Sequence, residues 1–516
     1  MTAMRLLDQP LDFARLPGEV AAYGADTDGD GMLAFAKAVK DSGGRFVALW
    51  GADQREDAAG YAVHVAFGLA EGLALLTLPL AADAPRYPDL EPLYPAANRP
   101  QRATRDLLGI VATGGDPRPW LRHNNWPADF YPLRRDCDAS RTFPPQPEDY
   151  AFVRVEGEGV HEIPVGPIHA GIIEPGHFRF SIVGEKVLRL EQRLGWTHKG
   201  VEKRFEQMTL SDGCRLAGRI SGDSTVAYAW AYCLAAESLC ATAVPARARW
   251  LRALLLERER VANHLGDLGY LGNDAALSFG LSQFMRLKED WLRTQAQLFG
   301  HRALMDCVCP GGVAIDLTAQ GAAALVEQCS AIEREVRLLK HIYDEHAGLQ
   351  DRFLTTGRLA PALAAELSVA GLAGRASSQT WDLRLQNPVS PYAELEVQMA
   401  SHRAGDVAAR VTLRFEELFE SLRLINEIVA RLPEGALCAP LGAPGRALGL
   451  GWIEGWRGDV LVALQVDGDG VIRRCHAHDP SWNIWPALEH AVMGNIVPDF
   501  PLINKSFNLS YSGVDL

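Results

Sequence analysis

A proline-rich stretch limits how this sequence can fold. In RTFPPQPEDY, residues 141–150, three prolines follow one another closely. Proline fixes its own backbone torsion and has no N–H donor, so such a stretch continues neither a helix nor a central strand. Because the chain of 516 residues is also longer than one average domain, we expect two folded parts. They should cover residues 1–140 and 159–516, joined by a linker at 141–158.

The first part has the pattern of a mixed α/β domain. Residues 31–43 (GMLAFAKAVKDSG) space their apolar side chains as a helix does. Residues 45–52 (RFVALWGA) and 61–69 (YAVHVAFGL) are rich in aromatic and β-branched residues, which favour strands. The pattern therefore predicts at least one helix and two strands before the linker.

The second part is predicted to be mainly helical over residues 199–435. Its clearest helix lies in residues 406–435, where apolar residues recur on one face until Pro433 and Gly435 end the pattern. Small β elements should stand on either side of the helices. Residues 177–190 alternate around a glycine turn, and residues 459–473 contain an Asp-Gly turn, so both read as hairpins.

We expect those two hairpins to pair with each other. The whole chain then has the α+β class, with an α/β domain followed by a helical domain that carries small β elements.

Composition excludes several classes of partner and site. The formal net charge of −13 argues against a nucleic-acid partner. No run of apolar residues is long enough to span a membrane, and the first residues lack the apolar core of a secretory signal. We therefore expect the chain to stay in the cytoplasm. None of the nine cysteines forms a Cys-x-x-Cys pair, so no iron–sulfur cluster is expected on this chain.

Two loops carry side chains that can move protons. GPIHAGIIEPGHFRF, residues 166–180, gathers His169, Glu174 and His177 between glycines and prolines. One interpretation is a polar loop in a cleft, where Glu174 and His177 carry protons. The alternative is a structural loop whose histidines bond to backbone carbonyls. Further on, His198 and Lys199 stand at the entry to a helix, where an exposed charged helix start is the simpler interpretation.

One helix and one strand place ionisable groups on a single face. In residues 256–275 the steps are i+3, i+4 and i+3, which predicts either a buried network or a solvated face. The four residues are Glu257, Arg260, His264 and Asp267. Near the C-terminus, His476 and His478 alternate on a strand before Asp479 and so share a face. No nearby set of cysteines or carboxylates completes a metal site there.

Several blocks together resemble one superfamily, which comprises the large subunit of nickel–iron hydrogenases and the 49-kDa subunit of respiratory complex I. They span residues 160–516 in order, and the nearest branch is the hydrogenase-4 and formate hydrogenlyase group. The blocks are GPIHAGIIEPGHFRF, LGWTHKGVEK, LERERVANHLGDLGYLGNDA, CPGGVAIDL, GRASSQTWDLRLQNP, GDVAARV and EGWRGDV.

The first part resembles the 30-kDa subunit of complex I. YPDLEPLYPAANRPQRATRDLLGI and YPLRRD carry this similarity, with Gln101-Arg102 where the pattern has Glu-Arg. The two subunits are thus fused here, as they are in hydrogenase-4-type large subunits.

The resemblance implies a metal site whose ligands this chain lacks. The family holds nickel and iron with four thiolates from two Cys-x-x-Cys pairs, because soft thiolates suit these metals. Here RISGDS gives Ser221 and Ser224, and we align DPSWNI with the second pair, which gives Ser481 and Ile484. Tyr228 stands where hydrogenases usually carry histidine. We expect no metal on this chain, and Asp223 becomes a new carboxylate in the former metal pocket.

From the resemblance we expect a subunit of a membrane-bound oxidoreductase without hydrogenase activity. Electrons would pass from an iron–sulfur cluster in a small partner subunit to a quinone or another small acceptor, coupled to ion translocation by integral-membrane antiporter-like subunits. The complex would hold the chain at the cytoplasmic side of the inner membrane. The alternative is a scaffold or proton-relay subunit without a redox role.

The resemblance also suggests roles for individual residues. Lys199, with His198, would face the partner's cluster, while Gly222 takes the position of complex I's quinone-binding tyrosine. The predicted catalytic residues are Glu174, His177, Asp223 and Arg457. The predicted pocket residues are His169, Ser221, Ser224, Tyr228, Asp479 and Ser481. Asp223 and Arg457 should pair across the pocket and keep Asp223 ionised.

Overall fold

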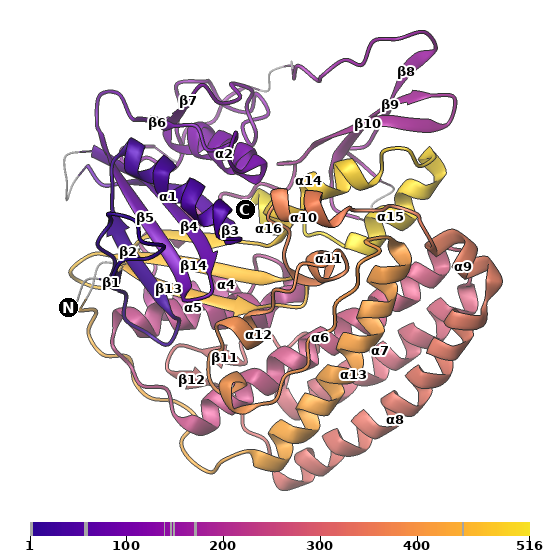
Figure 1. The fold of residues 1–516 in the computed structure, drawn as a ribbon. Coiled ribbons are helices and arrows are strands. Elements are labelled where there is room, and N and C mark those ends of the chain that lie inside the picture. Colours follow the sequence, from indigo (N-terminus) through magenta and orange to yellow (C-terminus); the bar gives the residue numbers. More distant parts are fainter. Residues whose placement is uncertain are drawn as a thin grey trace.

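A five-stranded sheet forms the centre of the first half. The computed structural model describes residues 4–55, 60–138, 140–144, 147, 150–169, 173–445 and 448–516. The strand order is β1-β2-β5-β4-β3, and only the β2–β5 pair is parallel. The elements are β1 (Ala14–Arg15), β2 (Ala22–Asp26), α1 (Gly29–Asp41), β3 (Arg45–Asp53), β4 (Gly60–Leu69), β5 (Gly72–Ala81), β6 (Arg86–Pro88), η1 (Pro95–Ala97), α2 (Asn98–Leu108) and β7 (Val111–Thr113). The helix and both strands predicted for this half are confirmed as α1, β3 and β4 (Figure 1).

The second half begins with a small sheet and the first helices. β8 (Val160–Val165), β9 (His177–Val183) and β10 (Lys186–Arg193) form a three-stranded antiparallel sheet at one end of the molecule (Figure 1). The next elements are α3 (Val201–Phe205), α4 (Leu210–Ala217), η2 (Gly222–Ser224), α5 (Thr225–Leu239), α6 (Ala246–Asp274), α7 (Ser278–Phe299), β11 (Val308–Cys309), β12 (Gly312–Val313) and α8 (Ala319–Glu345).

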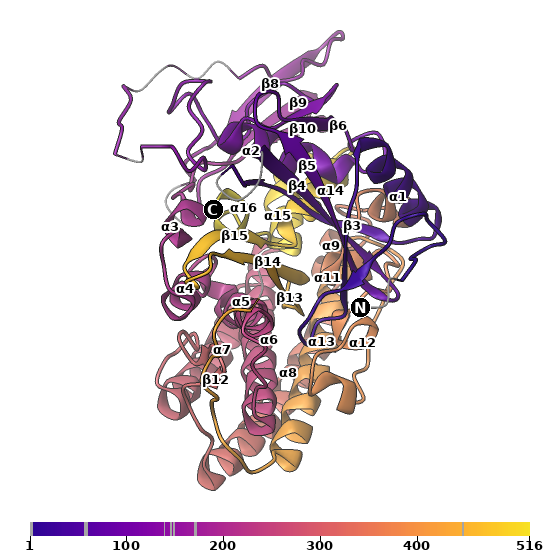
Figure 2. The ribbon, with the colours of Figure 1, turned by 90° about the vertical axis from the view of Figure 1, so that its left-hand side faces the viewer.

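The remaining elements complete the helical bundle and a third sheet. They are α9 (Ala347–Phe353), α10 (Pro361–Glu366), α11 (Gly371–Arg375), α12 (Leu383–Gln386), η3 (Tyr392–Glu394), α13 (Val407–Arg431), β13 (Leu448–Glu454), β14 (Asp459–Val466), β15 (Ile472–His478), α14 (Ser481–Ala491), η4 (Val497–Asp499), α15 (Phe500–Phe507) and α16 (Ser512–Asp515). Figure 2 shows the β13–β15 sheet between the first half and the bundle of α6, α7, α8 and α13. Among the described residues, no helix combines the length and apolarity needed to cross a bilayer.

The two predicted hairpins form, but the expected pairing between them is wrong. β9 and β10 pair with each other, and β9 also pairs with β8. β14 pairs with β13 and β15 in a separate sheet. The sequence pattern does not predict β8 or β13, because their apolar residues are few or interrupted by glycine. Each hairpin therefore completes its sheet with a neighbour in the sequence.

The central helix α5 is buried on every side and lies directly on the β13–β15 sheet. Glycines in β13 allow this close approach. A side chain at Gly451 would place its Cβ 1.8 Å from the carbonyl oxygen of Ala231, and one at Gly449 would lie 2.2 Å from that of Ala235. The sheet therefore packs directly against the middle and the C-terminal half of α5.

The two halves are joined through a polar and aromatic seam. Arg45 on β3 forms a buried ion pair with Asp459 on β14. The ring of Trp50 lies between the imidazoles of His64 and His476, with centroid distances of 5.2 and 4.8 Å. One continuous hydrophobic core includes residues of both halves. The predicted linker boundaries thus remain a prediction, while the parts on either side of them share one core.

The seam makes stability sensitive to acid. Burial, together with the neighbouring Arg474 and His476, lowers the pKa of His64 from 6.5 to about 3. The unfolded chain takes up this proton below pH 6.5, whereas the folded chain does not until about pH 3. The contribution of His64 to stability is therefore complete above pH 6.5 and is lost as the pH falls, by about 1.4 kcal/mol per pH unit.

Urea unfolding between pH 7.5 and 4.5 checks this expectation. His64→Asn should show a shallower fall in unfolding free energy than the native chain. The exposed His341 serves as control, and His341→Asn should leave the slope unchanged. Equal slopes for the native chain and His64→Asn would contradict the assignment.

Candidate functional site

The loop at residues 221–224 forms the turn between α4 and α5. Ser224 stands at the N-cap position of α5 without making a side-chain cap. The carboxylate of Glu259 on α6 takes over that function by accepting hydrogen bonds from the backbone of Val226 at 2.6 Å and Ala227 at 3.2 Å. Acceptor oxygens suit this place because the first N–H groups of a helix lack partners inside the helix. The loop is thereby fixed against α6.

Asp223 and Arg457 form the predicted ion pair. Arg457 lies in the turn between β13 and β14, and its two terminal nitrogens reach the two carboxylate oxygens of Asp223, one of them at 2.9 Å. The guanidinium also donates to Ser224 Oγ at 3.2 Å and to the carbonyl of Asn508 at 2.6 Å. Its carbon lies 4.0 Å from the ring centre of Trp456. Such a bidentate pair fixes both geometry and charge.

The pair has one buried and one accessible member. The side chain of Arg457 is 6% exposed and that of Asp223 is 41% exposed. Neighbouring protein atoms still raise the pKa of Asp223 by desolvation. The charge and hydrogen bonds of Arg457, with the hydrogen bond from Ser221, outweigh this and lower it from 3.8 to about 2. Asp223 is therefore ionised near neutral pH, and it presents a carboxylate edge to the outside.

A directed chain of hydroxyl groups reaches Asp223 from the C-terminal segment. Ser221 donates to the Asp223 carboxylate at 2.8 Å, and its oxygen lies 2.9 Å from Ser510 Oγ. Because the Ser221 proton is already committed, the Ser510 hydroxyl donates to Ser221. Ser510 Oγ in turn accepts from the backbone N–H of Gly513 at 2.9 Å.

This geometry corrects the alignment of the second ligand pair. The residue that contacts Ser221 is Ser510, whereas Ser481 lies behind it and accepts from the Ser510 backbone at 3.0 Å. Ser510 and Gly513 have the same three-residue spacing as Ser221 and Ser224. That spacing was the signal in the sequence that could have found them. The segment DPSWNI resembles the expected motif only in its Asp-Pro pair, and this pair is the reason for the incorrect assignment of Ser481 and Ile484.

A second, fully buried polar group lies beside the chain of hydroxyl groups. It consists of Tyr228, Asp479 and Ser481. The Tyr228 hydroxyl donates to Asp479 at 2.8 Å, and the other oxygen of Asp479 accepts from the backbone of Ser481 at 2.8 Å. Burial, and then the charge of Asp479, raise the pKa of Tyr228 well above its usual range. A side chain at Gly513 would place its Cβ 2.5 Å from Asp479, so this position requires glycine.

Of the predicted site residues in the loop at residues 166–180, one lies near the site and two do not. Glu174 approaches the site, since its carboxylate accepts from the backbone of Ser512 at 3.2 Å. His169 instead contacts the carbonyl of Gly176 at 2.7 Å, and His177 contacts that of Gly166 at 3.3 Å. His177 also lines a separate groove of about 520 Å³. Both histidines thus make the backbone contacts expected of a structural loop.

The predicted partner-facing residues are tied to the segment that carries Ser510. His198 Nδ1 lies 2.7 Å from the carbonyl oxygen of Asp515, and the backbone N–H of Lys199 donates to that of Leu516 at 2.8 Å. The Lys199 side chain is exposed. Residues 509–516 therefore connect the surface around Lys199 with the hydroxyl chain.

The helix face of α6 forms a buried network, as one of the two interpretations predicted. Glu257, Arg260 and His264 are 0% exposed, and Asp267 is 3% exposed. His264 lies 3.0 Å from Glu417, and Asp267 pairs with Arg414 at 2.9 Å. Asp267 also accepts from the side chain of Asn508 at 2.7 Å, and the carbonyl of Asn508 accepts from Arg457. The network thus begins two contacts away from the Asp223–Arg457 pair.

The donor set at the site does not fit a nickel–iron centre. Serine hydroxyls stay protonated near neutral pH and are hard ligands, whereas these metals need soft thiolates. Asp223, the carboxylate between the two serines, is already bound by Arg457. Within the part of the chain that the structure describes, no group of three or more His, Cys, Asp or Glu side chains is arranged to hold a metal. The arrangement can instead bind a hydrogen-bonding group at the open edge of Asp223.

Family models match both halves of the chain. Residues 25–143 match the respiratory-chain NADH dehydrogenase 30 Kd subunit, and residues 274–445 match the 49 Kd subunit of the same enzyme. The predicted fold class, an α/β domain followed by a mainly helical domain, is thereby confirmed.

Relatives over nearly the whole length narrow the family further. Formate hydrogenlyase subunit 5 of Escherichia coli is 31% identical, covering 92% of this chain and 85% of its own. Hydrogenase-4 component G of the same organism is 30% identical, covering 90% and 83%. A chain in the structure of an archaeal membrane-bound sulfane sulfur reductase is 23% identical. Its TM-score is 0.65, and the match covers 70% of this chain and 99% of that one, which shows a shared fold. This chain, a fusion of 30-kDa-like and 49-kDa-like parts, therefore belongs to the family of formate hydrogenlyase subunit 5 and hydrogenase-4 component G.

Proposed function

We propose that this chain is the peripheral subunit of a membrane-bound oxidoreductase related to complex I. Electrons pass from an iron–sulfur cluster in a small partner subunit to a quinone or another small acceptor. The reaction is coupled to ion translocation by integral-membrane subunits and does not involve hydrogen. The chain is held at the cytoplasmic side of the membrane through these partners. One observation carries the proposal: in a chain of this family, the ion pair of Asp223 and Arg457 stands where the thiolate pocket is expected.

The geometry supports an acceptor at the open edge of the ion pair. Asp223 is fixed by Arg457 and Ser221 yet remains 41% exposed. A carbonyl or hydroxyl group that arrives there meets a fixed carboxylate, a guanidinium and serine hydroxyls. These groups orient the acceptor, and a guanidinium stabilises negative charge that develops on it. Residues 509–516 connect this edge with the predicted cluster-facing surface at Lys199.

Acceptor reduction by the intact complex tests the proposal. The complex should be purified from native membranes and supplied with a reduced donor and either a water-soluble quinone or polysulfide. The proposal predicts that the native complex turns over with one of these acceptors and that turnover falls roughly tenfold in Asp223→Asn. Charge-assisted contacts of this kind contribute about 1.5–3 kcal/mol. Hydrogen uptake by the same preparation would overturn it.

Metal analysis gives an independent prediction. Because the four thiolates are replaced by Ser221, Ser224, Ser510 and Gly513, we expect less than about 0.1 nickel per chain, set by the poor affinity of hydroxyl ligands for soft metal centres. Plasma mass spectrometry of the isolated subunit measures this directly. About one nickel per chain would show that other donors form a site.

A second candidate function rests on the buried network. Asp223, Arg457, Asn508 and Asp267 are in contact one after another, and Asp267 lies on the same face of α6 as His264 and Glu257. Glu174 joins the site through Ser512. Such a chain of polar groups suits a proton relay or a scaffold that passes a change of charge to other subunits. The variant Asp267→Asn distinguishes the two candidate functions. It should impair ion transport, while acceptor reduction continues without being coupled to that transport.

A further inference from the structure

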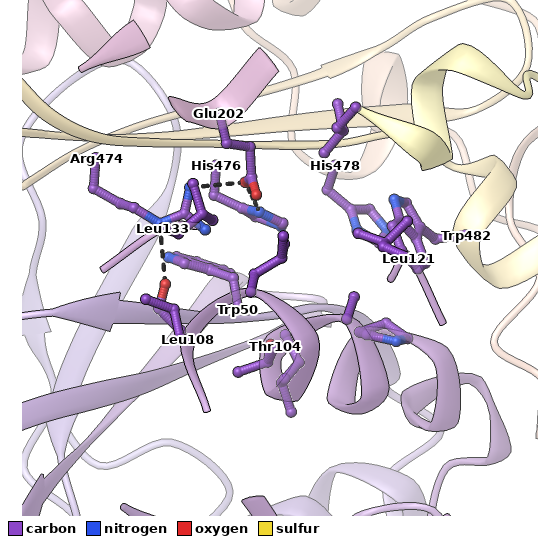
Figure 3. A pocket seen from close by; sticks show the side chains of 16 residues that line it. Trp50, Thr104, Leu108, Leu121, Leu133, Glu202, Arg474, His476, His478 and Trp482 are labelled. Atoms are coloured by element: carbon purple, nitrogen blue, oxygen red, sulfur yellow. Dashed lines mark hydrogen bonds and ion pairs between the residues drawn. The ribbon is translucent and has the colours of Figure 1, made fainter. Parts of the chain in front are cut away.

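A small cavity lies in the seam between the two halves of the chain, away from the Asp223–Arg457 pair. It has a volume of about 30 Å³. The first half contributes Trp50, Thr104, Leu108 and Leu121 to its wall, and the second half contributes His476, His478 and Trp482 (Figure 3). Most of the lining is apolar, so the few polar atoms that face it determine what it can hold.

Three ring nitrogens of these lining residues are buried without a partner in the described chain. They are His476 Nε2, His478 Nε2 and Trp482 Nε1. The residues His476 and His478 are 6% and 2% exposed. A buried polar group that makes no hydrogen bond costs free energy, and native proteins leave few of them. Three such atoms around one cavity therefore point to a common hydrogen-bonding ligand.

The tautomer of His476 shows what the ligand must offer. His476 Nδ1 lies 2.8 Å from the Glu202 carboxylate, which is itself paired with Arg474 at 2.8 Å (Figure 3). A carboxylate only accepts hydrogen bonds, so Nδ1 carries the proton and donates it. In the neutral ring, Nε2 then has a lone pair and needs a donor. The indole N–H of Trp482 needs an acceptor, so the ligand must both donate and accept.

Size and charge select among small molecules. A water molecule needs about 10–15 Å³ of such volume, so the cavity has room for one or two. The histidine centroids are 6.2 Å apart, a separation that one molecule between two hydrogen bonds can bridge. A cation would be repelled by the nearby Arg474 and would find no set of ligands. An anion would be repelled by Glu202. A neutral molecule that donates and accepts is therefore favoured.

We propose that this cavity is an internal hydration site, in which ordered water bridges His476 and His478 at the seam between the two halves of the chain. The site does not depend on the proposed redox function. It gives the His-x-His pair of β15 a role in holding buried water in place of a metal-binding one. Water in this position makes about three hydrogen bonds, which is typical of buried waters that are retained.

A structure of the full-length chain in its complex, at a resolution that shows water, tests the proposal. We expect a density peak within about 2.7–3.2 Å of Nε2 of both histidines. Xenon under pressure provides the opposite test, because dry apolar cavities bind xenon and hydrated ones with several hydrogen bonds do not. A xenon peak in the native cavity, or no water peak at all, would overturn the proposal.

Two variants of His478 add a test that depends on hydrogen bonding rather than on size. His478→Gln keeps a polar group near the position of Nε2, whereas His478→Leu removes it. Amide exchange in β15 should be roughly tenfold faster in His478→Leu than in His478→Gln, because the water loses one partner. Equal exchange in the two variants would count against the bridge. If His478→Leu does not fold, the xenon and water measurements on the native chain still decide.

Discussion

Replacing Arg375 with methionine should destabilise the chain by about 3–5 kcal/mol, the usual cost of removing one partner from a buried ion network. Arg375 is 1% exposed. It donates to Glu417 at 2.8 Å and to Glu454 at 2.8 Å, and it lies 3.7 Å from Asp382. Methionine keeps much of the volume but leaves these carboxylates buried without their shared cation. The expected result is therefore a large loss of stability.

Thermal or urea unfolding measures this effect. Lys37→Met provides the matched control, since Lys37 and Asp41 form an ion pair in which both side chains are more than 60% exposed. Removing such a surface pair within one helix costs only about 0.3–0.5 kcal/mol. A loss below about 1 kcal/mol in Arg375→Met would mean that the network relaxes or takes up water, contrary to the packing described.

Replacing Asp223 with alanine should impair the complex more than any change at the serines around it. The substitution leaves the Arg457 guanidinium, 6% exposed, without its carboxylate partner. Because Asp223 itself is partly exposed, we expect a loss of stability of about 1–3 kcal/mol, which is smaller than for a fully buried pair. Acceptor turnover should fall by roughly tenfold or more, since the same carboxylate forms the open edge of the site.

Ser224→Ala is the control for that variant. It removes one contact with Arg457 at 3.2 Å and leaves both oxygens of Asp223 paired. We expect near-native stability and turnover. If Asp223→Ala and Ser224→Ala both behave like the native chain in a coupled transport assay, the site around Asp223 and Arg457 is inert packing.

The sequence was sufficient to predict the family, the order of the two parts and the Asp223–Arg457 pair. The family and the order of the parts followed from motifs that are local in the chain. The ion pair followed from two opposite charges that the resemblance aligned with one pocket. Periodicity alone does not show what lies opposite a helix face. It therefore could not decide whether this face of α6 is buried or solvated. Its partners, Glu417 and Arg414, come from α13, about 150 residues later.

Ser510 and Gly513 escaped prediction for a similar reason. Their side chains carry no metal ligand, so the only clue was a three-residue spacing within an unremarkable sequence. Asp479-Pro480 offered a closer match to the expected motif and drew the alignment to Ser481. Only the contact between Ser221 and Ser510 identifies the segment that faces the first pair. The pairing of the two hairpins failed because strand partners depend on neighbouring strands that the pattern does not reveal.

Reoxidation of the iron–sulfur cluster that we propose for the partner subunit tests the central claim most directly. The purified complex is reduced without oxygen and mixed with the acceptor that supports turnover, and the cluster is followed by electron paramagnetic resonance. We predict rapid reoxidation in the native complex and reoxidation slowed by roughly tenfold in Asp223→Ala, in line with the loss of one charge-assisted contact. An unchanged rate in Asp223→Ala, in a complex that keeps its cluster, would contradict an acceptor site at Asp223 and Arg457.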